Sequence, residues 1–172
     1  SKAAIYTYQS GDYENALKYA ILAKQLGNTS VDVDSVMTES GMKAGGFDGI
    51  RSNLSAVRSA GVLPGENFYL LAARYAQEED NPGELAYWGR ELATVYPTPK
   101  NWRIALAGYR DWREPSPEEA LDLFRLWRLT GAMDNERDYV DYFDSSALNG
   151  NPLYPTELLA VLGEGVAAGH VD

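Results

Sequence analysis

GDYENALKYAILAKQLG, residues 11–27, holds the features from which the fold of this chain can be predicted. Residues 11–13 form a turn that leads into a helix. Ala16 and Ala23 are seven residues apart, so they lie on one face of that helix. Alanine on this face lets a second helix approach closely, and Gly27 follows the last turn, where glycine ends a helix at little cost. The stretch therefore predicts one member of a closely packed helix pair.

The same pattern returns along the chain with a period near 34 residues. Gly45 lies 34 residues after Gly11 and begins a second turn of glycine and aromatic residues. Ala86 and Ala93 repeat the alanine pair after a later turn, and Ala120 lies 34 residues beyond Ala86. A fixed period of this length is typical of helical-repeat proteins, in which each repeat is a pair of helices.

Start and stop signals predict the individual helices. Ser116, Pro117 and Glu119 supply an N-cap, a proline in the first turn and the glutamate of a capping box, and Gly61 and Gly131 follow apolar helical runs. No segment shows the sustained alternation of a strand. We expect an all-α protein with helices near residues 1–10, 13–26, 34–44, 47–60, 66–79, 83–95, 100–113, 117–130, 135–148 and 156–168.

The turn at residues 11–13, the pair Ala16 and Ala23, and their echoes resemble tetratricopeptide repeats (TPRs). This resemblance implies a single domain over 1–172, a right-handed superhelix of about five antiparallel helical hairpins. The units would lie near 1–30, 31–65, 66–98, 99–133 and 134–172. The second unit departs from the pattern with Ile50 and Val57, and the fourth with Trp127. The first unit is short, so we expect the chain to be a fragment of a longer array.

Composition narrows the classes of partner. The 172 residues carry 15 Lys and Arg against 25 Asp and Glu, a formal charge of −10, which disfavours nucleic acid and anionic membranes. No apolar run is long enough to span a bilayer. The absence of cysteine excludes disulfides and thiolate metal sites but leaves the compartment open. The end of the chain, residues 158–169, is similar to a group of proteobacterial TPR proteins that are often exported, which slightly favours a periplasmic or secreted location.

The residue types present disfavour a catalytic site or a metal site. His170 is the only histidine and lies at the C-terminus, where we expect it to fray, so a Ser-His-Asp triad is disfavoured. Asp134, Asp138, Asp141 and Asp144 share one helical face and could in principle gather a cation, but a solvated helix face is the better interpretation. We expect no catalytic residue, no metal ion and no cofactor.

Four residues of the fourth unit form the candidate partner-binding site: Trp102, Tyr109, Trp112 and Arg113. Trp102, Tyr109 and Arg113 follow one another at steps of seven and four, so they share a stripe on a first helix, and first helices line the concave surface of this architecture. Trp, Tyr and Arg are also enriched at binding hot spots. The competing interpretation places the aromatic rings in the core between hairpins.

The sequence therefore predicts a non-enzymatic scaffold that binds a protein or peptide partner on its concave surface. The arginine favours a carboxylate-bearing segment. An alternative is a carbohydrate-binding module or carbohydrate-active enzyme, because the chain is rich in acidic and aromatic residues. A third interpretation, a capping module or a homo-oligomer, stays open.

Overall fold

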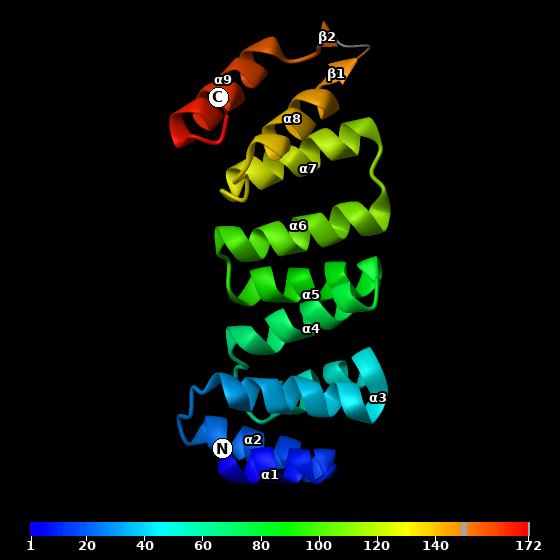
Figure 1. Cartoon of the computed structure of the whole chain (residues 1–172), viewed down its shortest axis with the longest axis vertical. Coiled ribbons are helices and arrows are strands. Elements are labelled where there is room, and N and C mark those ends of the chain that lie inside the picture. The colour runs from blue at the N-terminus through cyan, green and yellow to red at the C-terminus, as the bar shows by residue number, and fades with distance from the viewer. Residues whose placement is uncertain (149–150, 172) are drawn as a thin grey trace.

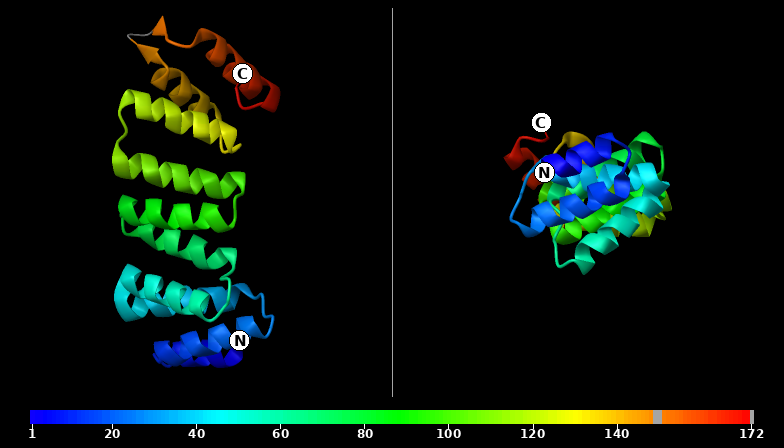
Figure 2. Two further views of the ribbon diagram at one scale, coloured as in Figure 1. Left: turned by 180° about the vertical axis from the view of Figure 1, so that it is seen from behind. Right: turned by 90° about the horizontal axis from the view of Figure 1, so that it is seen from below.

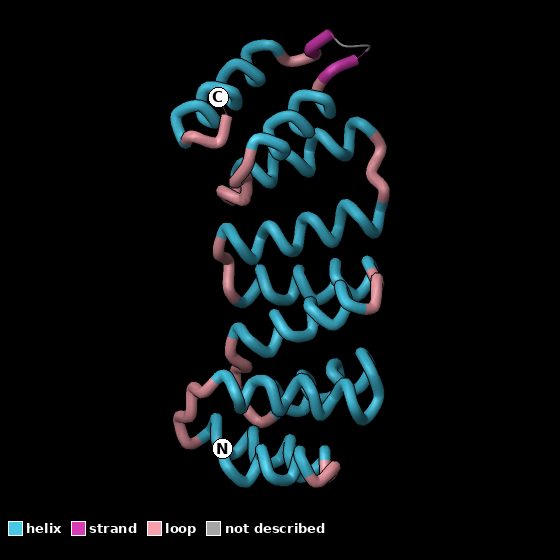
Figure 3. Tube along the Cα trace, viewed as in Figure 1, coloured by secondary structure: helices cyan, strands magenta, loops and turns pink. Residues whose placement is uncertain are grey.

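The computed structural model describes residues 1–148 and 151–171. This part of the chain is almost entirely helical, and its helices stack in chain order into an elongated body with the two termini at opposite ends (Figures 1, 2 and 3). The all-α prediction is confirmed at this level. The helices are α1 (Lys2–Gln9), α2 (Tyr13–Gln25), α3 (Val31–Ser59), α4 (Glu66–Glu78), α5 (Pro82–Val95), α6 (Pro99–Arg113), α7 (Pro117–Leu129), α8 (Glu136–Ser145) and α9 (Pro155–Ala168).

Helix α3 is two helical segments joined by a sharp bend. Gly45 and Gly46 leave helical geometry, and Gly46 has a φ of 62°, in the left-handed region that favours glycine. The two segments return on each other at Gly41 and Gly49, where a Cβ on Gly41 would meet the Gly49 carbonyl oxygen at 2.8 Å. The predicted pair of helices is present, but the first begins at Val31 and not at residue 34, because Ser30 caps it.

Six of the described helices begin with a side-chain cap. At α7 the Ser116 side chain accepts from the Glu119 backbone N–H while the Glu119 carboxylate accepts from the Ser116 N–H, so the predicted capping box forms. Five further helices have an N-cap side chain that accepts a backbone N–H: Asp12, Ser30, Asn81, Thr98 and Asn135. These contacts satisfy donors that a helix start leaves free.

The predicted end of the helix over 135–148 is wrong. The helix expected over 135–148 ends at Ser145, and the two-residue strands β1 (Ala147–Leu148) and β2 (Asn151–Pro152) pair in antiparallel fashion after it. Asparagine, glycine and proline follow one another in residues 149–152, and none of them favours the interior of a helix. The short ladder is visible beside α9 in Figure 3.

The small residues that predicted close helix crossings are buried. Ala16, Ala23, Ala86 and Ala93 all lie in the interior. A Cβ on Gly108 of α6 would lie 2.9 Å from the Ala86 backbone nitrogen of α5, so the backbones of these helices touch. The prediction of a packing role for these positions is confirmed.

The buried apolar residues form two clusters that meet near α6. The first extends from Ala4 to Leu92, with Trp88 and Phe68 among its large members, and the second extends from Leu106 to Val161 around Trp127. Helix α6 packs more extensively on α5 than on α7. At the junction between the two clusters, α6 therefore stands further from α7 than from α5. In the described ranges no helix is long and apolar enough to cross a membrane.

Candidate functional site

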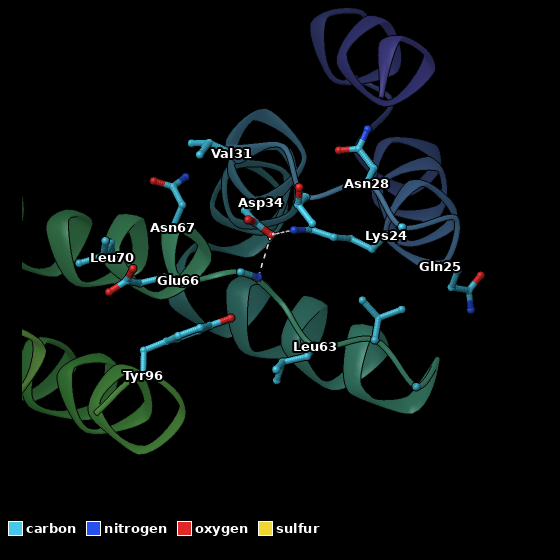
Figure 4. Close-up of a pocket in the computed structure, with 15 residues that line it drawn as sticks. Lys24, Gln25, Asn28, Val31, Asp34, Leu63, Glu66, Asn67, Leu70 and Tyr96 are labelled. Atoms are coloured by element: carbon cyan, nitrogen blue, oxygen red, sulfur yellow. Dashed lines mark hydrogen bonds and ion pairs between the residues drawn. The ribbon is translucent and has the colours of Figure 1, made fainter. Parts of the chain in front are cut away.

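A polar cavity of about 810 Å³ lies at one edge of the stack, where the loop after α2 meets the loop before α4 (Figure 4). At its base the Lys24 ammonium lies 2.7 Å from the Asp34 carboxylate, and the two side chains are only 8% and 4% exposed. Asp34 also accepts a hydrogen bond of 2.9 Å from the Gly65 backbone N–H. The charged groups of this cavity are thus used to join three segments of the fold.

A second polar cavity, of about 710 Å³, lies between α6 and α8. Arg103 of α6 makes two hydrogen bonds to the Asp138 carboxylate, of 2.6 and 3.2 Å, and these hold the Arg103 pKa above its usual value. Asp138 is buried, so the interpretation of these aspartates as a solvated face is wrong for this one. Asp141 pairs with Arg137 at 2.7 Å. No group of acidic or histidine side chains that could hold a metal ion occurs among the described residues.

His170 does not fray as predicted. Its backbone N–H donates to the Gly165 carbonyl at 2.9 Å, and its ring stacks on Tyr139 with centroids 6.2 Å apart. The half-buried imidazole closes the C-terminal end of α9 against α8. These contacts give it a packing role.

An apolar groove of about 730 Å³ is formed by α5, α6 and α7, with Arg51 of α3 at its margin. We call it the α5–α7 groove. It lies at the junction of the two buried clusters, where α6 and α7 separate. Its lining is mainly apolar and aromatic, with charged side chains at the margins: Arg51, Gly83, Ala86, Tyr87, Arg90, Thr94, Trp102, Ala105, Leu106, Tyr109, Trp112, Glu119, Asp122, Leu123 and Leu126.

Three of the four predicted site residues line this groove. Tyr109 and Trp112 are 42% and 50% exposed, and their rings meet edge to face with centroids 6.3 Å apart. Trp102 is half-buried and packs against the second apolar cluster while also lining the groove, so it serves both core and surface. Arg113 is not part of the lining; its guanidinium lies over the Trp112 ring, 4.9 Å from the centroid.

The four predicted residues lie on α6, the first helix of the predicted fourth unit. The walls of the groove come from α5 and α7, which correspond to second helices of the predicted units. Helix α6 packs closely on α5 and less extensively on α7, and the groove opens between α6 and α7. The stripe of Trp102 and Tyr109 faces that opening.

Sequence reasoning missed the residues that α5 and α7 contribute. Tyr87, Leu123 and Leu126 have the spacing of ordinary core positions, so no local signal separates them from buried neighbours. Arg51 and Arg90 have guanidinium groups 4.8 and 5.5 Å from the Tyr87 ring centroid. Cation–π contact of this kind holds both cations beside the groove.

No protein-family model, no curated protein and no solved structure matches this chain. The resemblance to tetratricopeptide repeats therefore stays a prediction, and the function is inferred from the site.

Proposed function

We propose that this protein is a non-enzymatic scaffold whose α5–α7 groove binds an apolar segment of a protein partner. We further propose that the chain is a TPR-like α-solenoid, a right-handed superhelix of about five antiparallel hairpins. The near-34-residue recurrence and the buried alanines at helix crossings support this architecture. Repeat proteins of this kind present extended surfaces to partners.

The observation that carries the proposal is the exposure of Tyr109 and Trp112 in an apolar groove. Large aromatic rings left half-exposed beside Leu106 and Leu123 form a surface that gains free energy when a partner covers it. Binding energy at protein interfaces concentrates on Trp and Tyr side chains of this kind. The groove volume also lies within the usual range of binding pockets.

The carbohydrate alternative has less support from this geometry. Sugars stack flat on an exposed aromatic face, whereas Tyr109 and Trp112 meet at an interplanar angle of 78°. Glu119 is engaged in the capping box of α7, and that contact lowers its pKa. It therefore lacks the raised pKa of a catalytic acid.

The proposal is tested by comparing partner capture from native lysate by Trp112→Ala, by Tyr109→Ala and by the unaltered protein. Each substitution should weaken capture of the same partner about tenfold or more, as removal of a hot-spot ring does. Tyr6→Ala is the matched control, because Tyr6 is an exposed aromatic residue on α1, far from the groove. Arg113→Ala should weaken capture less, since Arg113 lies outside the lining.

Melting temperatures are measured for each variant, because a folding defect would also reduce capture. Trp112 is half-exposed, so its removal should leave the melting temperature nearly unchanged. Equal capture by Trp112→Ala, Tyr109→Ala and the unaltered protein, with intact folding, would eliminate the groove as the partner site.

A further inference from the structure

The two walls of the α5–α7 groove carry charges of opposite sign. Arg51 and Arg90 lie on the α5 side, where both contact the Tyr87 ring. Glu119 and Asp122 lie on the α7 side. The apolar floor between them is made chiefly by α6. An occupant of the groove would therefore meet a cationic margin on one flank and an anionic margin on the other.

One charge on each wall is available to a partner. Arg90 is 69% exposed, and among the described residues its only ion pair is a 4.0 Å contact with Glu91. Asp122 is 77% exposed and pairs with Arg125, which also makes two hydrogen bonds of 2.9 Å to Glu157. Glu157 thus neutralises the charge of Arg125 even when Asp122 turns to a partner. Arg51, in contrast, is already bound to Glu84 and Asp48.

The groove walls favour a helical occupant over an extended strand. The backbone groups of α5 and α7 are paired within their own helices, so they offer no strand edge that a peptide could extend. Recognition must then rely on side chains. A helix supplies these from one face as apolar anchors at i, i+3 or i+4, and i+7, with charged residues on its two flanks.

We infer that the groove takes one amphipathic helix of a protein partner, with its acidic flank against Arg90 of α5 and its basic flank against Asp122 of α7. This inference rests on the proposed function. It adds the chemistry of the bound segment and the orientation of that segment along the groove. A helix turned end for end would place like charges together on both walls. Like-charge contacts select against the wrong arrangement, so the charges fix the direction in which the partner lies.

The test uses two synthetic helical peptides of the same composition. Both carry leucine at i, i+3 and i+7; the first has glutamate on one flank and lysine on the other, and the second has these flanks exchanged. A third peptide, with serine in place of leucine, is the control for purely electrostatic attachment. Since the chain has no cysteine, a single Thr94→Cys or Glu118→Cys substitution can be spin-labelled uniquely. These positions lie near the end of α5 and the start of α7.

The two leucine peptides should bind with similar affinity and in opposite directions, each with a preference of about tenfold or more. The label at Thr94→Cys should broaden the N-terminal resonances of one peptide and the C-terminal resonances of the other. The label at Glu118→Cys should do the reverse. Exchanging the wall charges with Arg90→Glu and Asp122→Lys should reverse the direction in which each peptide binds. Circular dichroism of this variant is the control for correct folding.

Each other outcome has a definite meaning. Leucine peptides that bind in the same direction, or in both directions equally, would overturn the charge-directed helix while leaving a partner-binding groove. Failure of the leucine peptides to bind at all would overturn the inference and the use of the groove in the proposed function. A dimer of the free protein that Arg90→Glu dissociates, seen by sedimentation, would assign the groove to a second copy of this chain.

Discussion

Lys24 and Asp34 form the most deeply buried ion pair among the residues that the structure describes. Lys24 belongs to α2 and Asp34 to α3. Gly65, whose backbone N–H donates to Asp34, is the N-cap of α4. A Cβ on Gly65 would lie 2.1 Å from an Asp34 oxygen, so a side chain at this position would displace the Asp34 carboxylate. One carboxylate thus holds three helices together at the edge of the stack (Figure 4).

Asp34→Asn should lower the free energy of unfolding by about 3–5 kcal/mol, because it leaves the Lys24 ammonium buried without a counter-charge. Urea unfolding measures the change. Glu14→Gln is the control, since it breaks the exposed pair between Glu14 and Lys18 and should produce no measurable change. Equal stability of Asp34→Asn and the unaltered protein would contradict a structural role for this pair.

At the scale of helices, the contact between α5 and α6 is the closest approach near the groove. A Cβ on Gly89 would come 2.7 Å from the Ala105 Cα, and the same situation recurs at Gly108 and Ala86. These backbone contacts fix α6 to α5. One side of α6 is packed against α5, and residues on its opposite side line the groove.

Gly89→Ala should destabilise the protein by about 1–3 kcal/mol, because the added methyl group forces α5 and α6 apart. This cost exceeds the helix-propensity gain of ~1 kcal/mol from replacing glycine with alanine. Gly163→Ala gives the opposite sign: no atom lies within 4 Å of its added Cβ, so α9 should gain roughly 0.5–1 kcal/mol. Denaturant unfolding of the two variants compares the same substitution in two environments. Equal stability of Gly89→Ala and Gly163→Ala would refute the close contact between α5 and α6.

For the whole molecule, the two apolar clusters suggest two regions of different stability. The helices of the second cluster pack less extensively on one another than those of the first. Glu157 of α9 is an important link in this region, since it accepts hydrogen bonds from Arg125 of α7 and from Tyr142 of α8. These bonds lower the pKa of Glu157 from 4.5 to about 2.

Hydrogen exchange should therefore show lower protection in α8 and α9 than in α4 and α5. Because the folded-state pKa of Glu157 is depressed, its stabilisation is complete above about pH 4.5 and is lost as the pH falls toward about 2. Protection factors in α9 should fall over that interval, after correction for intrinsic exchange rates.

Glu157→Gln should reduce protection in α9 at neutral pH and flatten its acid dependence. Glu136→Gln, an exposed change on α8, is the control and should alter neither. Uniform protection across the two clusters at every pH would contradict the division into regions of unequal stability.

Several features could be predicted from the sequence because they depend on neighbours along the chain. Capping at Ser116 and the helix stop at Gly27 involve residues within one or two turns, so local patterns identify them. The burial of Ala16 and Ala23 follows from their helical spacing and small size. The helix end at Ser145 could not be predicted, because Ala147 and Leu148 are compatible with a helix that continues past it.

The candidate site depended on tertiary structure. Spacing placed Trp102, Tyr109 and Arg113 on one stripe, but only the positions of α5 and α7 determine which face of α6 is open and leave Arg113 outside the groove. Asp138 likewise has the sequence pattern of a solvated acid, and only the fold places Arg103, 35 residues away in sequence, beside it. Local sequence determines which residues can form a helix and which face is apolar. Which neighbouring helix covers that face depends on how helices distant in sequence pack together.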